Sequence, residues 1–175
     1  MAALMLYLIR HPRPLIAAGI CYGQLDVEAE NPPAIAERLR AELPPGLPVW
    51  SSPLQRCRTL AEALHPAPQI DARLMELNFG AWEGRPWDAV PRAELDAWAA
   101  DVAGYASPGG ESPRQLQARV LDFVAGLGAG EHVLVTHAGV IRTLLAQAAG
   151  ESIADGLRRT ADYGSLTRLA YSGSR

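Results

Sequence analysis

Short apolar runs alternate along the chain with longer amphipathic segments, and this alternation predicts a βα repeat. Five segments are predicted as strands from their apolar residues and flanking turn residues: residues 4–9, 48–50, 68–71, 132–136 and 164–171. Strands that alternate with helices are typical of a largely parallel sheet. The pattern therefore predicts an α/β fold, a three-layer α/β/α sandwich with a mostly parallel central sheet.

The longer segments are predicted as helices, and two of them begin with recognisable capping residues. Asn31 precedes Pro32, and Ser112 precedes Pro113, which are favoured pairings at the N-cap and first helical positions. The expected helices cover residues 32–43, 53–64, 91–102, 113–127 and 140–149. Residues 76–85 contain Gly80 and Gly84 and are expected to be irregular.

Composition narrows the class of protein. The 175 residues are 49% hydrophobic with a formal net charge of −3, which predicts one domain over residues 1–175 and argues against nucleic acid as a partner. No apolar stretch approaches the roughly 20 residues of a membrane span, and the N-terminus lacks the basic start of a signal peptide. Cys21 and Cys57 are interpreted as core thiols, and so few cysteines favour a cytoplasmic location.

Two histidines stand where predicted strands end. Arg10-His11 follows the apolar run 4–9, and His137 follows the run 133–135. Open α/β sheets bind ligands at the carboxyl ends of their strands, so we expect both imidazoles in one crevice. Two imidazoles beside an arginine suit the transfer of an anionic group such as phosphoryl.

The residue types around this crevice suggest roles. A neutral imidazole at His11 can attack phosphorus, and the guanidinium groups of Arg10 and Arg56 match phosphoryl oxygens. His137 can donate to a phosphoryl oxygen, with the Ala138 amide at the following helix start as a second donor. These residues form the predicted phosphate site.

The proton donor for a leaving alcohol is less well defined by the sequence. Glu76 precedes the irregular segment and is slightly favoured, while Glu83 and Glu111 remain alternatives. Trp82 and Trp87 are interpreted as packing residues rather than as a substrate platform.

Taken together, these motifs resemble the histidine phosphatase superfamily, which has the phosphoglycerate mutase-like fold. The resemblance spans roughly residues 4–170, and its motifs occur in order: Arg10-His11, Ser52-Pro53-Leu54-Gln55-Arg56, Glu76-Leu77-Asn78-Phe79-Gly80, Gly110-Glu111-Ser112 and Thr136-His137-Ala138-Gly139. An ordered set of motifs is far more specific than any single one.

The resemblance implies a metal-independent hydrolase of the histidine acid phosphatase type, with no cofactor. It implies a phosphohistidine on His11 and assigns Glu76 as proton donor and then as base for water. Two departures bear on the phosphate site. Pro12 replaces the usual glycine and has no N–H, and Ala17 replaces an asparagine that helps to bind phosphate in the family.

The segments 10–14 and 19–26 are similar to those of bacterial α-ribazole phosphatases, which act in cobalamin biosynthesis. The expected substrate is therefore a small phosphate ester, first of all α-ribazole 5′-phosphate, with Arg13, Tyr22 and Glu111 as further lining residues. The alternatives are a broad-specificity phosphatase, a phosphoglycerate mutase, or a catalytically silent protein that binds phosphate esters.

Overall fold

A computed structural model describes residues 3–173 and contains a five-stranded sheet with the order β3-β2-β4-β1-β5. Only β5 runs antiparallel to its neighbour, β1. The strands are β1 (Leu4–Arg10), β2 (Val49–Ser51), β3 (Gln69–Ile70), β4 (Gly130–Thr136) and β5 (Leu166–Tyr171). All five predicted strands are confirmed, with bounds that differ by a few residues.

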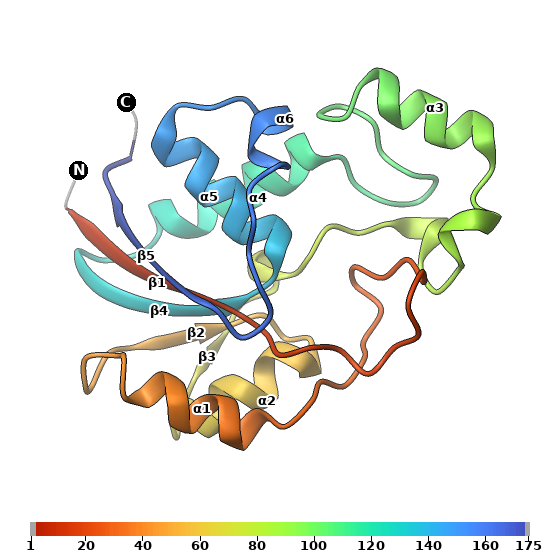
Figure 1. Ribbon diagram of the computed structural model, residues 1–175. Helices are drawn as coiled ribbons and strands as arrows, with labels where there is room; N and C mark the ends of the chain where they lie inside the picture. Colours follow the sequence, from red (N-terminus) through yellow and green to blue (C-terminus); the bar gives the residue numbers. More distant parts are fainter. Residues whose placement is uncertain (1–2, 174–175) are drawn as a thin grey trace.

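Helices cover both faces of this sheet, as the three-layer prediction requires (Figure 1). Helices α1 (Pro32–Arg40) and α2 (Gln55–Leu64) lie on one face, and α4 (Pro113–Ala125) and α5 (Ala138–Ala149) lie on the other. Helix α3 (Arg92–Ala100) lies away from the sheet, and the short α6 (Ile153–Gly156), which was not predicted, follows α5. Short 3₁₀ turns occupy Ala72–Leu74, Gly80–Trp82 and Trp87–Ala89.

The central strands build two cores because successive side chains point to opposite faces. On β1, Leu6 and Leu8 pack toward α4 and α5, whereas Tyr7 and Ile9 pack toward α1 and α2. A third cluster around Trp82 joins the irregular segments to α3. Within residues 3–173, each helix is too short or too polar to cross a lipid bilayer.

The predicted N-termini of the helices agree with the structure to different degrees. Ser112 caps α4 through a complete capping box, in which its Oγ accepts from the N–H of Gln115 at 3.2 Å and its own N–H donates to Gln115 Oε1 at 2.8 Å. Asn31 is the N-cap residue of α1, but its backbone is left-handed and its side chain accepts no capping hydrogen bond. Helix α5 begins at Ala138, two residues earlier than predicted.

Candidate active site

The register of two parallel strands brings the predicted histidines together. Arg10, the last residue of β1, pairs with Thr136, the last residue of β4. The next residue on each strand is a histidine, and the ring centroids of His11 and His137 lie 5.2 Å apart. Strand β2 ends beside them, and Ser52 Oγ lies 2.8 Å from His137 Nε2. The site is thus assembled where three parallel strands end.

The tautomer of His11 follows from its hydrogen bond. Its Nδ1 lies 2.7 Å from the carbonyl oxygen of Pro12, and because a carbonyl only accepts, Nδ1 carries the proton and Nε2 keeps its lone pair. Burial, reinforced by the charge of Arg56, lowers the pKa of His11 to about 3. Pro12, noted above for its missing N–H, thus contributes its carbonyl instead.

His137 is held still more tightly than His11. It is fully buried, and Cys57 Sγ lies 3.4 Å from its Nε2. Burial, followed by the charges of His11 and Arg56, lowers the pKa of His137 well below its ordinary value. Burial also raises the pKa of the Cys57 thiol, which is consistent with its interpretation as a core residue.

Each of the two predicted phosphate-binding arginines has an unpaired buried donor. Arg10 Nη1 donates to the carbonyl of Ala161 at 2.5 Å, and Arg56 donates to the carbonyls of Gly23 and Leu25. The Nε of each arginine is buried and has no hydrogen-bond partner among residues 3–173. Buried donors are almost always paired in native proteins, so two such atoms beside the histidines point to an anionic ligand.

Glu76 is the one of the three candidate proton donors that faces the cavity. Its Oε1 accepts from the N–H of Leu77 at 2.9 Å and its Oε2 from the N–H of Gly139 at 3.1 Å, within the first turn of α5. These bonds hold the carboxylate beside Ala138, which also lines the cavity. The slight preference of the sequence for Glu76 thus agrees with its placement.

The carboxylate of Glu83, unlike that of Glu76, is bound by the backbone of a loop. Its Oε1 accepts from the backbone N–H groups of Gln24 and Phe79, and its Oε2 from those of Gly23 and Leu25, at 2.8 to 3.1 Å. The carboxylate therefore fixes the turn whose carbonyl groups bind Arg56. Glu83 supports the loop and does not face the cavity.

Two of the three expected lining residues lie outside the cavity. Glu111 turns away and forms an ion pair with Arg119 at 2.6 Å. The Arg13 side chain is mostly exposed and lies 4.0 Å from Glu30. Tyr22 does line the cavity, and its hydroxyl lies 3.0 Å from that of Tyr163.

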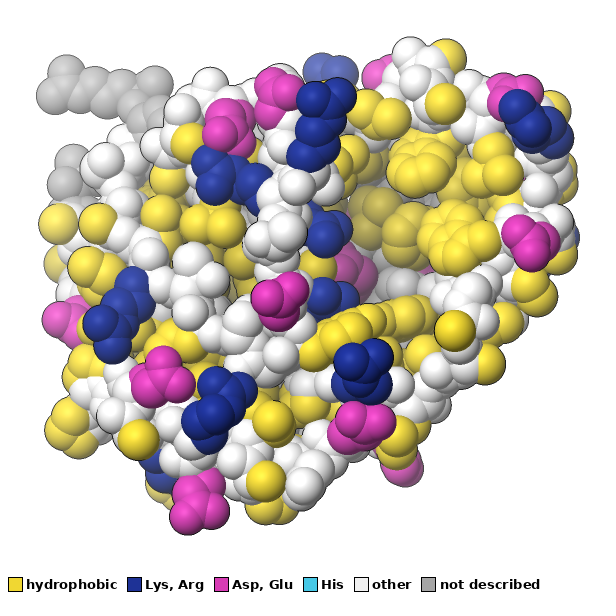
Figure 2. Space-filling model, in the orientation of Figure 1, with side chains coloured by type: hydrophobic (Ala, Val, Ile, Leu, Met, Phe, Trp, Pro, Cys, Tyr) yellow, Lys and Arg dark blue, Asp and Glu magenta, His cyan; other side chains and the backbone are white. Residues whose placement is uncertain are grey.

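The cavity extends from His11 toward α3, α5 and α6 and has a volume of about 380 Å³, and neither His137 nor Arg56 is among its lining residues. Most of its wall is apolar, and Figure 2 shows hydrophobic side chains around this hollow. Trp87 and Trp98 line it with nearly parallel rings, their centroids 6.4 Å apart at 17°. The packing interpretation holds for both residues: Trp82 is buried, and Trp87 packs against its cluster while also lining the cavity.

The sequence analysis did not predict several residues that line the cavity, among them Trp98 on α3 and Ile153 and Leu157 at α6. Arg142 and Gln117 add the polar side chains on this wall, and Arg142 Nε donates to the carbonyl of Arg159 at 2.7 Å. Residues 3–173 contain no group of three or more His, Cys, Asp or Glu side chains placed to hold a metal ion.

A mostly parallel sheet is covered by helices on both faces, and two buried histidines and an arginine stand at its strand ends; the architecture is that of the phosphoglycerate mutase-like fold. The family model "Histidine phosphatase superfamily (branch 1)" matches residues 6–175. The chain therefore belongs to the histidine phosphatase superfamily, and its structural neighbours place it among phosphatases and mutases.

Individual relatives support this membership. The structure of a phosphoglycerate mutase from Thermus thermophilus is similar at a TM-score of 0.79, with 33% identity over 97% of this chain and 94% of that one. A mycobacterial glucosyl-3-phosphoglycerate phosphatase has the same TM-score, with 30% identity over 95% and 89% of the two chains. A relative from Hydrogenobacter thermophilus, provisionally named phosphoserine phosphatase 2, is 24% identical over 97% of this chain and 91% of its own.

Proposed function

We propose that this protein hydrolyses a phosphate monoester through a phosphohistidine on His11. The observation that carries the proposal is the free Nε2 of His11 on the cavity wall, fixed by the bond from Nδ1 to the carbonyl of Pro12. A low pKa keeps this nitrogen unprotonated at neutral pH, so its lone pair is available to phosphorus.

In the first step, the lone pair of His11 Nε2 attacks phosphorus, and the bond from phosphorus to the ester oxygen breaks. A protonated Glu76 gives its proton to the leaving oxygen. Arg10, Arg56 and His137 stabilise the negative charge on the phosphoryl oxygens, with the Ala138 amide as a further donor. The two unpaired Nε–H groups of the arginines support this role.

In the second step, the Glu76 carboxylate takes a proton from water, and the water oxygen attacks phosphorus. The bond from nitrogen to phosphorus breaks, inorganic phosphate leaves, and the neutral imidazole of His11 is restored. The residues of this chain account for every proton in both steps, so we expect the reaction to need no metal or cofactor.

The aromatic wall of the cavity suits a leaving group that contains a flat, apolar ring. We therefore propose α-ribazole 5′-phosphate, an ester of cobalamin biosynthesis, as the substrate. The nearly parallel rings of Trp87 and Trp98 offer stacking surfaces, and a cavity of about 380 Å³ accommodates a small molecule. Phosphoserine and 3-phosphoglycerate have no aromatic ring to stack on these surfaces, although Arg142 on the same wall could pair with their carboxylates. We propose that Tyr22, which also lines the cavity, contacts the sugar.

Phosphate release in EDTA tests the proposal, with α-ribazole 5′-phosphate, 3-phosphoglycerate, phosphoserine and 4-nitrophenyl phosphate as substrates. We expect the ribazole ester to be hydrolysed fastest and His11→Ala to lose about 10⁴-fold in rate or more. His65→Ala, which changes a histidine at the end of α2, is the matched control and should keep full activity.

Each of the other possible outcomes would reject one part of the proposed function. Equal rates on all esters would reject α-ribazole and favour the broad-specificity phosphatase. Dependence on bisphosphoglycerate, with interconversion of phosphoglycerates, would favour the mutase. Tight binding without release would support the silent binding protein, and unchanged turnover in His11→Ala would reject the phosphohistidine.

A further inference from the structure

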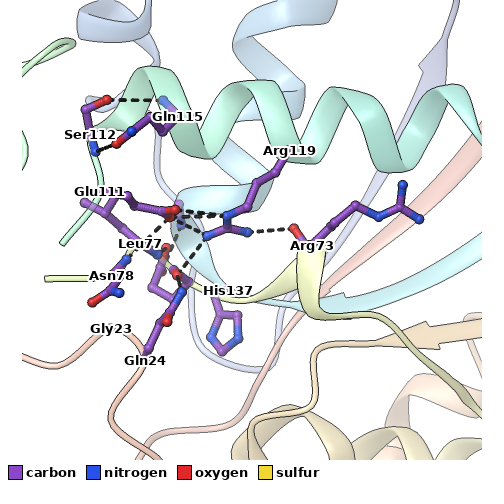
Figure 3. A network of polar contacts seen from close by, with 12 residues as sticks. Gly23, Gln24, Arg73, Leu77, Asn78, Glu111, Ser112, Gln115, Arg119 and His137 are labelled. Atoms are coloured by element: carbon purple, nitrogen blue, oxygen red, sulfur yellow. Dashed lines mark hydrogen bonds and ion pairs between the residues drawn. The ribbon is translucent and has the colours of Figure 1, made fainter. Parts of the chain in front are cut away.

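Arg119, which lies on α4, has a side chain that spans two segments of the site. It extends toward the loop before Glu76 (Figure 3). Its Nη1 donates to the carbonyl of Arg73 at 2.7 Å and its Nη2 to the carbonyl of Glu76 at 3.0 Å. Nε and Nη2 also bind the Glu111 carboxylate, with a shortest distance of 2.6 Å. One side chain thus ties α4 to the backbone that carries Glu76.

The backbone around Glu76 has no regular secondary structure of its own. Residues 75–79 belong to neither a helix nor a strand, so bonds to other segments must fix their path. The Glu76 carbonyl accepts a second bond from Gln24 Nε2 at 3.1 Å, and Glu111 also lies 3.4 Å from the N–H of Asn78. Arg119 is the only charged donor among these partners, and charge-assisted bonds are the stronger kind.

We infer that Arg119 is a positioning residue for Glu76: through the carbonyl groups of Glu76 and Arg73 it holds the proposed proton donor at the cavity wall. This inference rests on the proposed function. It assigns Glu111, expected from the sequence as a substrate-lining residue, to orienting Arg119. Proton transfer depends on hydrogen-bond distance to the leaving oxygen, so a small displacement of Glu76 would slow that transfer specifically.

A second ion pair in the same chain provides a matched comparison. Arg159 binds Glu151 through Nε and Nη2, and as in the first pair the two residues are eight positions apart. The side chains of that pair are about one-third exposed, against one-fifth for Arg119 and Glu111. Among the described hydrogen bonds, the Arg159 guanidinium contacts no backbone carbonyl of the site. Arg159→Lys therefore controls for the loss of a forked ion pair alone.

Two aromatic esters with different leaving groups test the inference. Benzyl alkoxide needs a proton to leave, whereas 4-nitrophenolate does not, and the two leaving groups are similar in size and both aromatic. For Arg119→Ala we expect kcat/KM on benzyl phosphate to fall about 10²-fold and on 4-nitrophenyl phosphate less than about threefold. Arg119→Lys should show the same selectivity with smaller losses, and Arg159→Lys should show neither.

Equal losses on the two esters would overturn the inference, because a merely structural residue would affect both. Full activity of both Arg119 variants on benzyl phosphate would overturn it as well. If Arg119→Ala does not fold in a thermal melt, Arg119→Lys and Glu111→Gln give the same comparison. Acid-labile phosphate trapped on His11 of the unaltered protein tests the proposed function separately, whatever the Arg119 variants do.

Discussion

The phosphate half of the site and its aromatic half are built in opposite ways. At the phosphate half, His11 lines the cavity, whereas the fully buried His137 and Arg56 do not. The ends of paired strands hold the two histidines, and the first turn of α2 holds Arg56. At the other half, Trp87 and Trp98 are partly exposed on a 3₁₀ turn and on α3, a helix with no buried residue. In the proposed reaction, the sheet therefore holds the residues that bind the phosphoryl group, while the leaving group meets elements that can change without disturbing those residues.

The comparison indicates that the two halves of the site differ in how much substitution they tolerate. Replacing a strand-end residue disturbs the sheet register or leaves a buried charge unpaired, so these positions tolerate little change. Replacing an aromatic residue on α3 alters a wall that contacts solvent and substrate. We therefore expect substitutions in the phosphate half to affect all esters and substitutions in the aromatic half to affect only some.

After the loss of His11 itself, the largest effect is expected for Arg56→Lys. Lysine cannot reproduce the two bonds to the carbonyls of Gly23 and Leu25 and also offer the remaining N–H, so kcat/KM should fall about 10²- to 10³-fold for every ester. Steady-state assays on the four esters measure this. Arg58→Lys, on the exposed side of the same helix, is the control. A loss confined to one leaving group would place Arg56 outside the phosphate half.

Gly139→Ala separates catalysis from stability. A Cβ at this position would overlap Glu76 Oε1, so the carboxylate must move, whereas α5 gains up to about 1 kcal/mol in helix propensity. We expect kcat/KM on benzyl phosphate to fall about 10²-fold while the melting temperature holds or rises. Gly128→Ala has open space around it and serves as the control. Unchanged activity would show that the position of Glu76 does not matter.

Trp98→Ala tests the aromatic half directly. Loss of the stacking surface beside Trp87 should raise KM for α-ribazole 5′-phosphate about tenfold, equivalent to about 1.4 kcal/mol of lost contact energy. Turnover of phosphoserine and inhibition by inorganic phosphate should remain unchanged, because both depend on the strand-end residues. An equal loss on phosphoserine would contradict the division of the site into two halves.

The last prediction concerns stability against acid rather than activity. Below about pH 6.5 the unfolded chain binds protons on its histidines, whereas the folded protein keeps His11 neutral down to a pKa of about 3. The free energy of unfolding should therefore fall as pH falls between these values, by up to about 1.4 kcal/mol per pH unit for this residue. Urea unfolding at several pH values should give a flatter profile for His11→Asn. A profile as steep as that of the unaltered protein would contradict the neutral state of His11.

Local patterns in the sequence were sufficient to predict the sheet and the meeting of the two histidines at its edge. An apolar run that ends in His11 and another that ends in His137 define both strands and their last residues, and parallel pairing then brings the histidines together. Glu76 was only slightly favoured on local grounds. The path of residues 75–79 depends on bonds from distant segments, and no local pattern encodes these.

The aromatic half could not be predicted in the same way. Trp98 faces the cavity because α3 is set away from the sheet, an arrangement that depends on two irregular connections. One feature of the sequence points to the contact between Arg119 and Glu111. Arg119 lies seven residues after Ser112, which is two helical turns, and this spacing puts it on the side of α4 near Glu111. The spacing alone does not distinguish an ion pair from a solvated side chain.

The position of β1 in the sheet also has a consequence for how the protein is made. This apolar strand is synthesised first, yet its two partners, β4 and β5, belong to the last part of the chain. On the ribosome, β1 must therefore remain unpaired until β4 and β5 have emerged, and long-range pairings of this kind form slowly. Because the same pairing brings His11 beside His137, a chain that has not yet reached β4 lacks the assembled site and depends on protection from aggregation.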